Sequence, residues 1–347
     1  MDLFKIQKAI KMKRDKLADC LKGYACLLVA FGHVILGIRN GGNVKIPFFN
    51  EELESFIWSF HVELFMFLSG YVYQLTGGCN GKRSRPGFVK HKLLNLGVPY
   101  FAFSAVYIVI NSLIPGVNNS NELSDILFLW KDPVAQYWFL YTLFVLFLLW
   151  TVLSLFLKNW QITALLVILY YVCNFADIRI PFLDKGLGYA FSFGLGTCLN
   201  SLAADKWKKS AKIIMIAVHI SVVSVFIYTG FTNKKFFDDA EEFLGIAASI
   251  AFISLIIKWT AAEKALLFIN KYSFPIYLLH TIFTSGTRII LLRLGIHNYE
   301  IHVIGALILG IGVPVLVGMV TERITVLDFF FYPSKNIKRL KDTKSVA

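Results

Sequence analysis

Long apolar runs, separated by short charged segments, dominate the sequence from end to end. A run of about 20 apolar residues is long enough to cross the hydrocarbon core of a bilayer as a helix. Ten runs of this kind occupy residues 17–38, 56–75, 93–113, 137–157, 162–175, 186–202, 213–230, 243–259, 273–292 and 302–320. The pattern predicts an all-α fold, a polytopic bundle of about ten transmembrane helices. The fifth run is short, which leaves nine spans as the alternative count.

Composition supports this interpretation, because 56% of the residues are hydrophobic and only 16% are charged. A soluble protein of 347 residues needs more polar surface to cover its core. The formal net charge of +13 would suggest a nucleic-acid partner in a soluble chain. Here the basic residues flank apolar runs, as charges that set membrane topology do. We therefore expect a lipid bilayer as a partner and no nucleic acid.

Lysine and arginine alternate in number from loop to loop, which predicts the orientation. With the N-terminus in the cytoplasm, 25 of them lie on the cytoplasmic side and 8 on the outer side. Both termini are then cytoplasmic in a multi-pass protein of the cell (inner) membrane. We expect a single transmembrane domain over residues 1–347, with a basic amphipathic arm at 1–16 and a basic tail at 323–347.

The five cysteines form no C-x-x-C pair and lie scattered along the chain. This spacing predicts neither a disulfide framework nor a metal site.

The first apolar run carries its polar residues on one helical face. Asp19, Lys22 and His33 share this face with small residues, at spacings of three or four. Lys22 and His33 are eleven residues apart, about 16 Å along a helix axis. Such a stripe is typical of a helix that lines a polar cleft; the alternative is a packing face with one satisfied histidine.

Two further runs carry ionisable residues. His61 and Glu63 lie near the start of the second run, two residues apart and so on nearly opposite faces. At most one of them is expected to share a site with His33, and either fits an interfacial position as well. In the ninth run, His280 and Arg288 belong to a second polar stripe. The alternative for His280 is a hydrogen bond between helices.

Basic residues gather just before the third run, and Lys90 and Lys92 lead into that helix. Charge of this kind sets topology and attracts anionic lipid, but it also suits a polyphosphate ligand. A histidine-lined cleft with a basic mouth is compatible with a channel, a carrier such as a proton-coupled transporter or flippase, or a membrane-embedded enzyme.

Several motifs resemble the membrane acyltransferase 3 family, in particular its sugar O-acetyltransferase branch with fucose O-acetylase-like proteins. They cover about residues 16–290. They are Asp19-x-x-Lys22-Gly23 with Gly32-His33, Phe60-His61-x-x-Leu64-Phe65, Lys90-x-Lys92-Leu93-Leu94, Trp138-Phe139-Leu140, Pro181-Phe182-x-Asp184-Lys185 and Ser273-x-x-x-Tyr277-Leu278-Leu279-His280.

The resemblance implies a ten-helix enzyme that moves an acyl group, usually acetyl, from cytoplasmic acyl-CoA to a hydroxyl of a cell-surface glycan or its lipid-linked precursor. No permanently bound cofactor is implied; acetyl-CoA (acyl-CoA) is a co-substrate. His33 would be the catalytic residue, with Glu63 or His61 orienting its ring and His280 in a second proton-handling role. His33 would act as general base or carry the acyl group briefly.

The resemblance also implies that Lys22, Lys90 and Lys92 hold the CoA phosphates. Asp19 and Arg288 complete the set of candidate substrate-binding residues. Many family members have arginine at the three lysine positions. Lysine keeps the charge but lacks the bidentate guanidinium geometry.

Overall fold

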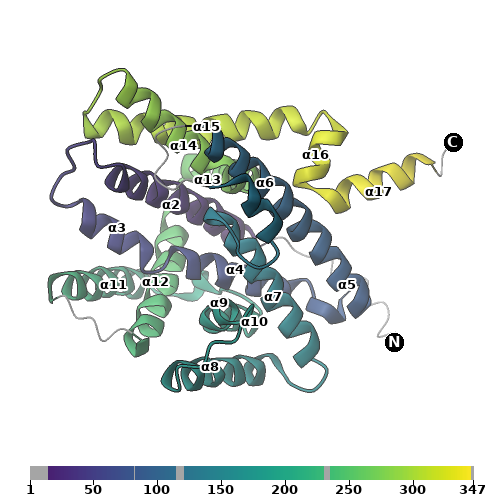
Figure 1. Cartoon of the computed structure of the whole chain (residues 1–347). Coiled ribbons are helices and arrows are strands. Elements are labelled where there is room, and N and C mark those ends of the chain that lie inside the picture. Colours follow the sequence, from purple (N-terminus) through teal and green to yellow (C-terminus); the bar gives the residue numbers. More distant parts are fainter. Residues whose placement is uncertain (1–14, 82, 115–120, 230–234, 345–347) are drawn as a thin grey trace.

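The computed structural model describes residues 15–81, 83–114, 121–229 and 235–344, and within these ranges the chain contains helices and no strands (Figure 1). The all-α prediction is confirmed. Most of the predicted basic arm, residues 1–14, lies outside the described residues. The helices are α2 (Lys16–Gly41), α3 (Asn50–Trp58), α4 (His61–Leu75), α5 (Arg85–Lys92), α6 (Val98–Leu113), α7 (Trp138–Leu153), α8 (Asn159–Phe175), α9 (Asp184–Gly188), α10 (Ala190–Thr197), α11 (Lys209–Thr229), α12 (Lys235–Ile256), α13 (Thr260–Lys271), α14 (Ser273–Arg293), α15 (Tyr299–Thr321), α16 (Thr325–Phe331) and α17 (Pro333–Lys344).

Seven stretches of the described chain are long and apolar enough to span a membrane. They are Lys16–Gly41, Asn50–Leu75, Arg85–Leu113, Ala135–Leu153, Lys209–Thr229, Ser273–Arg293 and Tyr299–Thr321. Helix α8 is apolar but shorter. The molecule is therefore a multi-pass membrane protein.

The predicted sixth span, residues 186–202, is wrong as a continuous helix. The chain forms two short helices there, α9 and α10, and α10 ends at Thr197. The segment carries glycines at 186, 188, 194 and 196, and glycine is a poor helix former. Together the two helices have 13 residues, about 20 Å, which is less than the hydrocarbon thickness.

Helix α2 runs through the middle of the bundle, with α14 and α15 on one side and α4 on the other (Figure 1). Its N-terminus is capped by Asp15, whose side chain accepts a hydrogen bond from the Ala18 amide at 3.1 Å. Helix α13, a segment expected as a loop, packs along the start of α2. The polar stripe of α2 is therefore enclosed by other helices.

Helices α4 and α10 pack with their backbones in close contact through two glycines. A Cβ on Gly70 would collide with the carbonyl oxygen of Phe193, and one on Gly196 with that of Phe67. Small residues at membrane helix interfaces allow this approach, which gains van der Waals contact between backbones. The pair fixes the position of α4, which carries His61.

The third span contains a π-helical segment, η2 (Leu93–Gly97), between α5 and α6. Pro99 has no N–H to donate to the carbonyl of Asn95, four residues earlier, and its ring crowds that carbonyl. A local π-type widening accommodates the proline and turns Leu96 toward a cavity described below.

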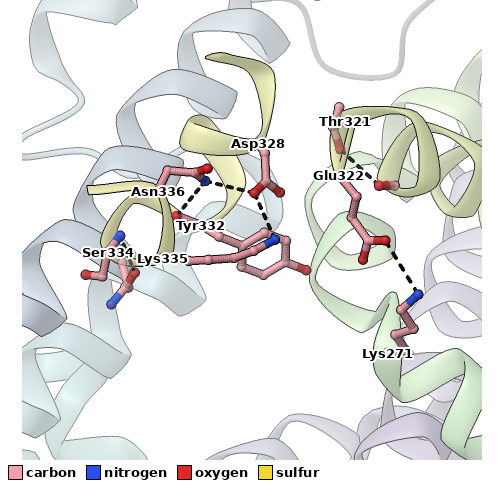
Figure 2. A network of polar contacts seen from close by, with 10 residues as sticks. Lys271, Thr321, Glu322, Asp328, Tyr332, Ser334, Lys335 and Asn336 are labelled. Atoms are coloured by element: carbon pink, nitrogen blue, oxygen red, sulfur yellow. Dashed lines mark hydrogen bonds and ion pairs between the residues drawn. The ribbon is translucent and has the colours of Figure 1, made fainter. Parts of the chain in front are cut away.

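The predicted basic tail, as far as residue 344, contains two helices. Helices α16 and α17 meet at a corner held by Asp328, which is 1% exposed and accepts hydrogen bonds from Lys335 Nζ at 2.9 Å and Asn336 Nδ2 at 2.8 Å (Figure 2). The Ser334 amide donates to Asn95 Oδ1 at 3.3 Å. The corner is thus tied to the π-helical segment.

Asp328→Ala is expected to destabilise this corner, because Asn336 and Lys335 lose a buried acceptor. The loss of such charge-assisted hydrogen bonds costs about 1–3 kcal/mol. The thermal unfolding midpoint of the purified protein should fall. The matched control is Asp342→Ala, which removes an exposed carboxylate of α17. An Asp328→Ala protein as stable as the control would contradict this account of the corner.

Beside the corner, Lys271 and Glu322 form an ion pair at 3.5 Å (Figure 2). The hydrogen bond between Lys271 Nζ and Tyr272 Oη, at 2.6 Å, is the main cause that raises the pKa of Lys271 above 10.5. The ammonium therefore stays charged at neutral pH.

Candidate active site

Two cavities meet at His33. The apolar cavity, about 240 Å³, is lined by Val29, Val62, Phe65, Leu96, Phe139, Leu140 and Leu143 among others. The polar cavity, about 220 Å³, is lined by Asn40, Tyr107, Asn111, Thr281, Thr284 and Ser285 among others. His33, Gln136 and Trp138 line both. A reacting atom held at His33 is therefore reachable from an apolar side and from a side rich in hydrogen-bonding groups.

The ring of His33 is oriented by its own helix. Its Nδ1 lies 2.9 Å from the carbonyl oxygen of Val29, four residues earlier. A carbonyl only accepts hydrogen bonds, so this contact places the proton on Nδ1 and leaves Nε2 as the basic nitrogen. The sequence suggested Glu63 or His61 as the orienting group; the structure assigns that contact to a backbone carbonyl.

Two other histidines stand next to His33. The His33 and His280 ring centroids are 4.9 Å apart, and Trp58 lies 5.5 Å from His33 and 4.9 Å from His61. His61 lines the apolar cavity with His33. The break between α3 and α4 puts Trp58 and His61 on the two sides of one corner.

His61 and His280 share the tautomer of His33. His61 Nδ1 contacts the carbonyl of Ile57 at 2.8 Å, and His280 Nδ1 contacts that of Ile276 at 2.9 Å. Their Nε2 atoms are buried and have no hydrogen-bond partner among the described residues. Each of the three histidines therefore carries its proton on Nδ1 and has a basic Nε2.

Glu63 faces a different space. It lines a third cavity, about 320 Å³, together with Arg179, Asp184, Lys185 and Glu242. Because His61 and Glu63 point to opposite faces of α4, only His61 reaches the histidine cluster. Of the two residues, His61 is therefore the one that lines a cavity together with His33.

Gln136 is a site residue that the sequence analysis missed. Its Nε2 donates to the carbonyl of Leu278 at 3.4 Å, while Oε1 is buried and has no partner among the described residues. It lies in η4 (Ala135–Tyr137), which is tied to α14 by Tyr277 Oη donating to the Gln136 carbonyl at 2.7 Å. The preceding Ala135 has φ +45°, a strained conformation of a kind that collects at functional sites. A lone glutamine in a loop gives no periodic signal.

Trp138 lines both the apolar and the polar cavity. Its ring stacks on Tyr189 with centroids 5.4 Å apart, and Lys185 Nζ lies 5.4 Å from the ring centroid. These contacts hold the indole beside His33.

Lysines gather near the N-terminal end of α2. Lys22 pairs with Asp19 at 3.8 Å, and Lys92 Nζ lies 3.5 Å from the centre of the Phe147 ring. Lys92 is close enough to Lys22 and Arg83 to interact electrostatically with both. Lys90 is exposed on α5. We call Lys22, Lys90 and Lys92 the basic mouth.

The basic mouth leads to the apolar cavity along three helices. Val29 follows Lys22 by two turns of α2, and Leu96 follows Lys92 by one turn. On α7, Leu143 precedes Phe147 by one turn.

Arg288 lies at the opposite end of α2. It is 5% exposed, and its guanidinium sits against Gly41, the last residue of that helix. Lys22 and Gly41 are 19 residues apart, about 28 Å along the helix. Arg288 and the basic mouth therefore belong to two separate regions.

The described residues contain no group of three histidine, cysteine, aspartate or glutamate side chains that could hold a metal ion.

A family profile for the acyltransferase domain matches residues 16–323, which include both cavities and the basic mouth. The chain belongs to the acyltransferase 3 family. The resemblance found in the sequence is thereby confirmed, and the matched region ends just before α16.

Two curated relatives of this acyltransferase 3 member are nodulation proteins NolL. The one from Mesorhizobium japonicum is 28% identical over 198 residues, 55% of this chain and 48% of the relative. The one from Sinorhizobium fredii is 29% identical over 161 residues, 45% of this chain and 42% of the relative. The matches thus span about half the length of these relatives. No solved structure matches the chain.

Proposed function

We propose that the protein is a membrane-embedded O-acyltransferase. It moves an acetyl or other acyl group from acyl-CoA to a hydroxyl of a cell-surface glycan or its lipid-linked precursor. The observation that carries this proposal is the position of His33, which lines an apolar and a polar cavity at once. Family membership supports acyl transfer as the reaction class.

The donor enters at the basic mouth. Lys22 and Lys92 bind CoA phosphates, and the Asp19 carboxylate, which would repel phosphate, instead holds the Lys22 ammonium in place. The pantetheine arm then follows Val29 and Leu96 through the apolar cavity. Lys22 and His33 are about 16 Å apart along α2, so an extended arm brings the thioester to the imidazole.

The acceptor enters from the polar cavity. Amides and hydroxyls of Asn40, Asn111, Thr284 and Ser285 offer donors and acceptors of the kind that a sugar needs. The buried Oε1 of Gln136 is placed to accept a hydrogen bond from the acceptor hydroxyl.

Acyl transfer forms a C–O bond and breaks the thioester C–S bond. In the direct mechanism, His33 Nε2 takes the proton from the acceptor hydroxyl, the oxygen attacks the carbonyl, and the thiolate leaves and is protonated. In the covalent alternative, Nε2 attacks first and the acyl-imidazole then acylates the hydroxyl. His61 and His280 supply further basic nitrogens for the proton.

The proposal also assigns the two substrates to opposite sides of the membrane. The excess of lysine and arginine at the N-terminal end of α2 favours a cytoplasmic position for the basic mouth and for both termini, with about ten spans in the inner membrane. The donor then arrives from the cytoplasm and the acceptor from the opposite side or the outer leaflet.

Replacing Lys22 and Lys92 by alanine is expected to raise the KM for acetyl-CoA about tenfold or more with little change in kcat. Each charge-assisted hydrogen bond to phosphate contributes about 1.5–3 kcal/mol, and about 1.4 kcal/mol corresponds to a factor of ten. Initial rates in membrane vesicles at graded acetyl-CoA concentrations measure this effect.

The matched control is Lys264→Ala, an exposed lysine of α13. Lys90→Ala, added to Lys92→Ala, tests whether the exposed lysine takes part. An unchanged acetyl-CoA dependence in the Lys22 and Lys92 double variant would remove the phosphate role.

A further inference from the structure

A fourth cavity, about 540 Å³, lies apart from the candidate active site. It is enclosed by the start of α2, by η5 (Ala204–Lys206), by the start of α11, by the end of α12 and by α13. Four lysines line it, Lys16, Lys209, Lys212 and Lys258, together with Trp207. Lys16 and His33 are 17 residues apart on α2, about 26 Å, so the cavity is not part of the transfer site.

Most of the carboxylates in this cavity are engaged. Glu263 pairs with Lys16 at 3.1 Å. Asp15 accepts hydrogen bonds from the Ala18 amide and from Tyr71 Oη. Of the carboxylates that line the cavity, this leaves Asp205. Three of the lysines, Lys209, Lys212 and Lys258, have no side-chain ion pair within the described ranges. The cavity therefore has an excess of positive charge.

Lys212 is the most informative of these lysines. It is 4% exposed, it lines the cavity, and its side chain makes no hydrogen bond or ion pair with any described residue. Its ammonium lines the cavity without a counter-charge within the described ranges, so an anion in this space would stabilise the fold. The first amides of α11, which begins at Lys209, add donors that no helix carbonyl can satisfy.

The neighbouring surface indicates where the anion comes from. Ile213 and Ile214, next to Lys212, are 51% and 60% exposed, and Val218 and Ile220 continue this apolar face of α11. Leu202, Leu255 and Ile257 give the cavity apolar walls. A phospholipid fits both features, with its phosphate at Lys212 and its acyl chains along α11.

We propose that this cavity binds the phosphate of an anionic phospholipid headgroup. Basic pockets between membrane helices recognise such headgroups, and a tryptophan such as Trp207 is typical of the headgroup region. The bound lipid would join α2, which carries His33, to α11 and α12. This inference does not depend on the proposed acyl transfer.

The test uses the purified, delipidated full-length chain and added phosphatidylglycerol or phosphatidylcholine. Thermal unfolding and native mass spectrometry give stability and bound lipid. We expect phosphatidylglycerol to raise the Tm and to remain bound in the wild type, in His33→Ala and in Lys208→Gln, whose lysine is exposed outside the cavity. In Lys212→Gln the Tm shift should fall by at least half.

Lys258→Gln, two residues after the end of α12, replaces Lys212→Gln as the diagnostic variant if the latter does not fold. Equal shifts with the two lipids, or a full phosphatidylglycerol shift in both cavity variants, would overturn the proposal. Inorganic phosphate and coenzyme A, added without lipid, form the second arm, and neither should give a Tm shift that depends on Lys212, because coenzyme A is expected to bind at the basic mouth. Protection by either one that is lost in Lys212→Gln would assign the cavity to a soluble phosphate and overturn the lipid assignment.

Discussion

His33→Ala is expected to abolish acylation of the glycan while the protein remains in the membrane at normal abundance. Within the described residues His33 is the one histidine that lines both cavities, and alanine removes the base or nucleophile together with one hydrogen bond, to the Val29 carbonyl of the same helix. Loss of a general base costs about 10²–10⁴-fold in rate. NMR of purified polysaccharide measures the acetyl content, and immunoblotting of membranes measures abundance.

His297→Ala provides a matched control, because this exposed histidine contacts the Asn43 carbonyl outside both cavities. Its acetyl content should equal that of the wild type. Full acetylation of the glycan in cells with His33→Ala would contradict the assignment of His33 as the catalytic residue. His61→Ala and His280→Ala should give smaller losses if these residues only assist the proton transfer.

Replacing Gly70 or Gly196 by leucine is expected to prevent correct assembly of the bundle. Each new side chain would meet the backbone of the facing helix, which cannot rotate away as a side chain can. Overpacking a core costs typically about 1–3 kcal/mol and sometimes more, and a collision with backbone belongs at the upper end. Size-exclusion chromatography in detergent should show little monodisperse protein, and Gly70→Ala should show an intermediate yield.

Gly312→Leu is the control for this prediction, because a Cβ at that position of α15 would meet no heavy atom within 4 Å. Normal yield and stability of Gly70→Leu and Gly196→Leu would mean that α4 and α10 do not pack as described. His61 would then lose the support that places it near Trp58.

The apolar pattern alone predicted an all-helical membrane bundle and the main spans. It also predicted the α2 stripe, because spacings of three and four residues put Lys22 and His33 on one helix face wherever the helix lies. Such local periodicity is readable from one sequence. The break between α9 and α10 was missed because a glycine-rich apolar segment still has the hydropathy of a span.

The composition of the site was only partly predictable. His280 contacts His33 although the two residues are 247 positions apart in the chain, and no local pattern encodes that contact. Glu63 and Arg288 were grouped with the site because they are charged and lie within apolar runs. Glu63 lines another cavity, and Arg288 lies against Gly41, at the end of α2 opposite the basic mouth. The periodicity of a sequence predicts on which face of its own helix a residue lies. It does not predict which other helix packs against that face.

The central claim is that an acyl group passes from acyl-CoA to a hydroxyl at His33. The most direct measurement incubates the purified protein in liposomes with acetyl-CoA labelled in the acetyl group and an acceptor glycan, and follows labelled glycan and free CoA together. The account predicts one CoA released for each acetyl group incorporated, with neither product formed by His33→Ala. Movement of a polar solute across the liposome membrane without CoA release, or equal labelling by His33→Ala, would contradict it.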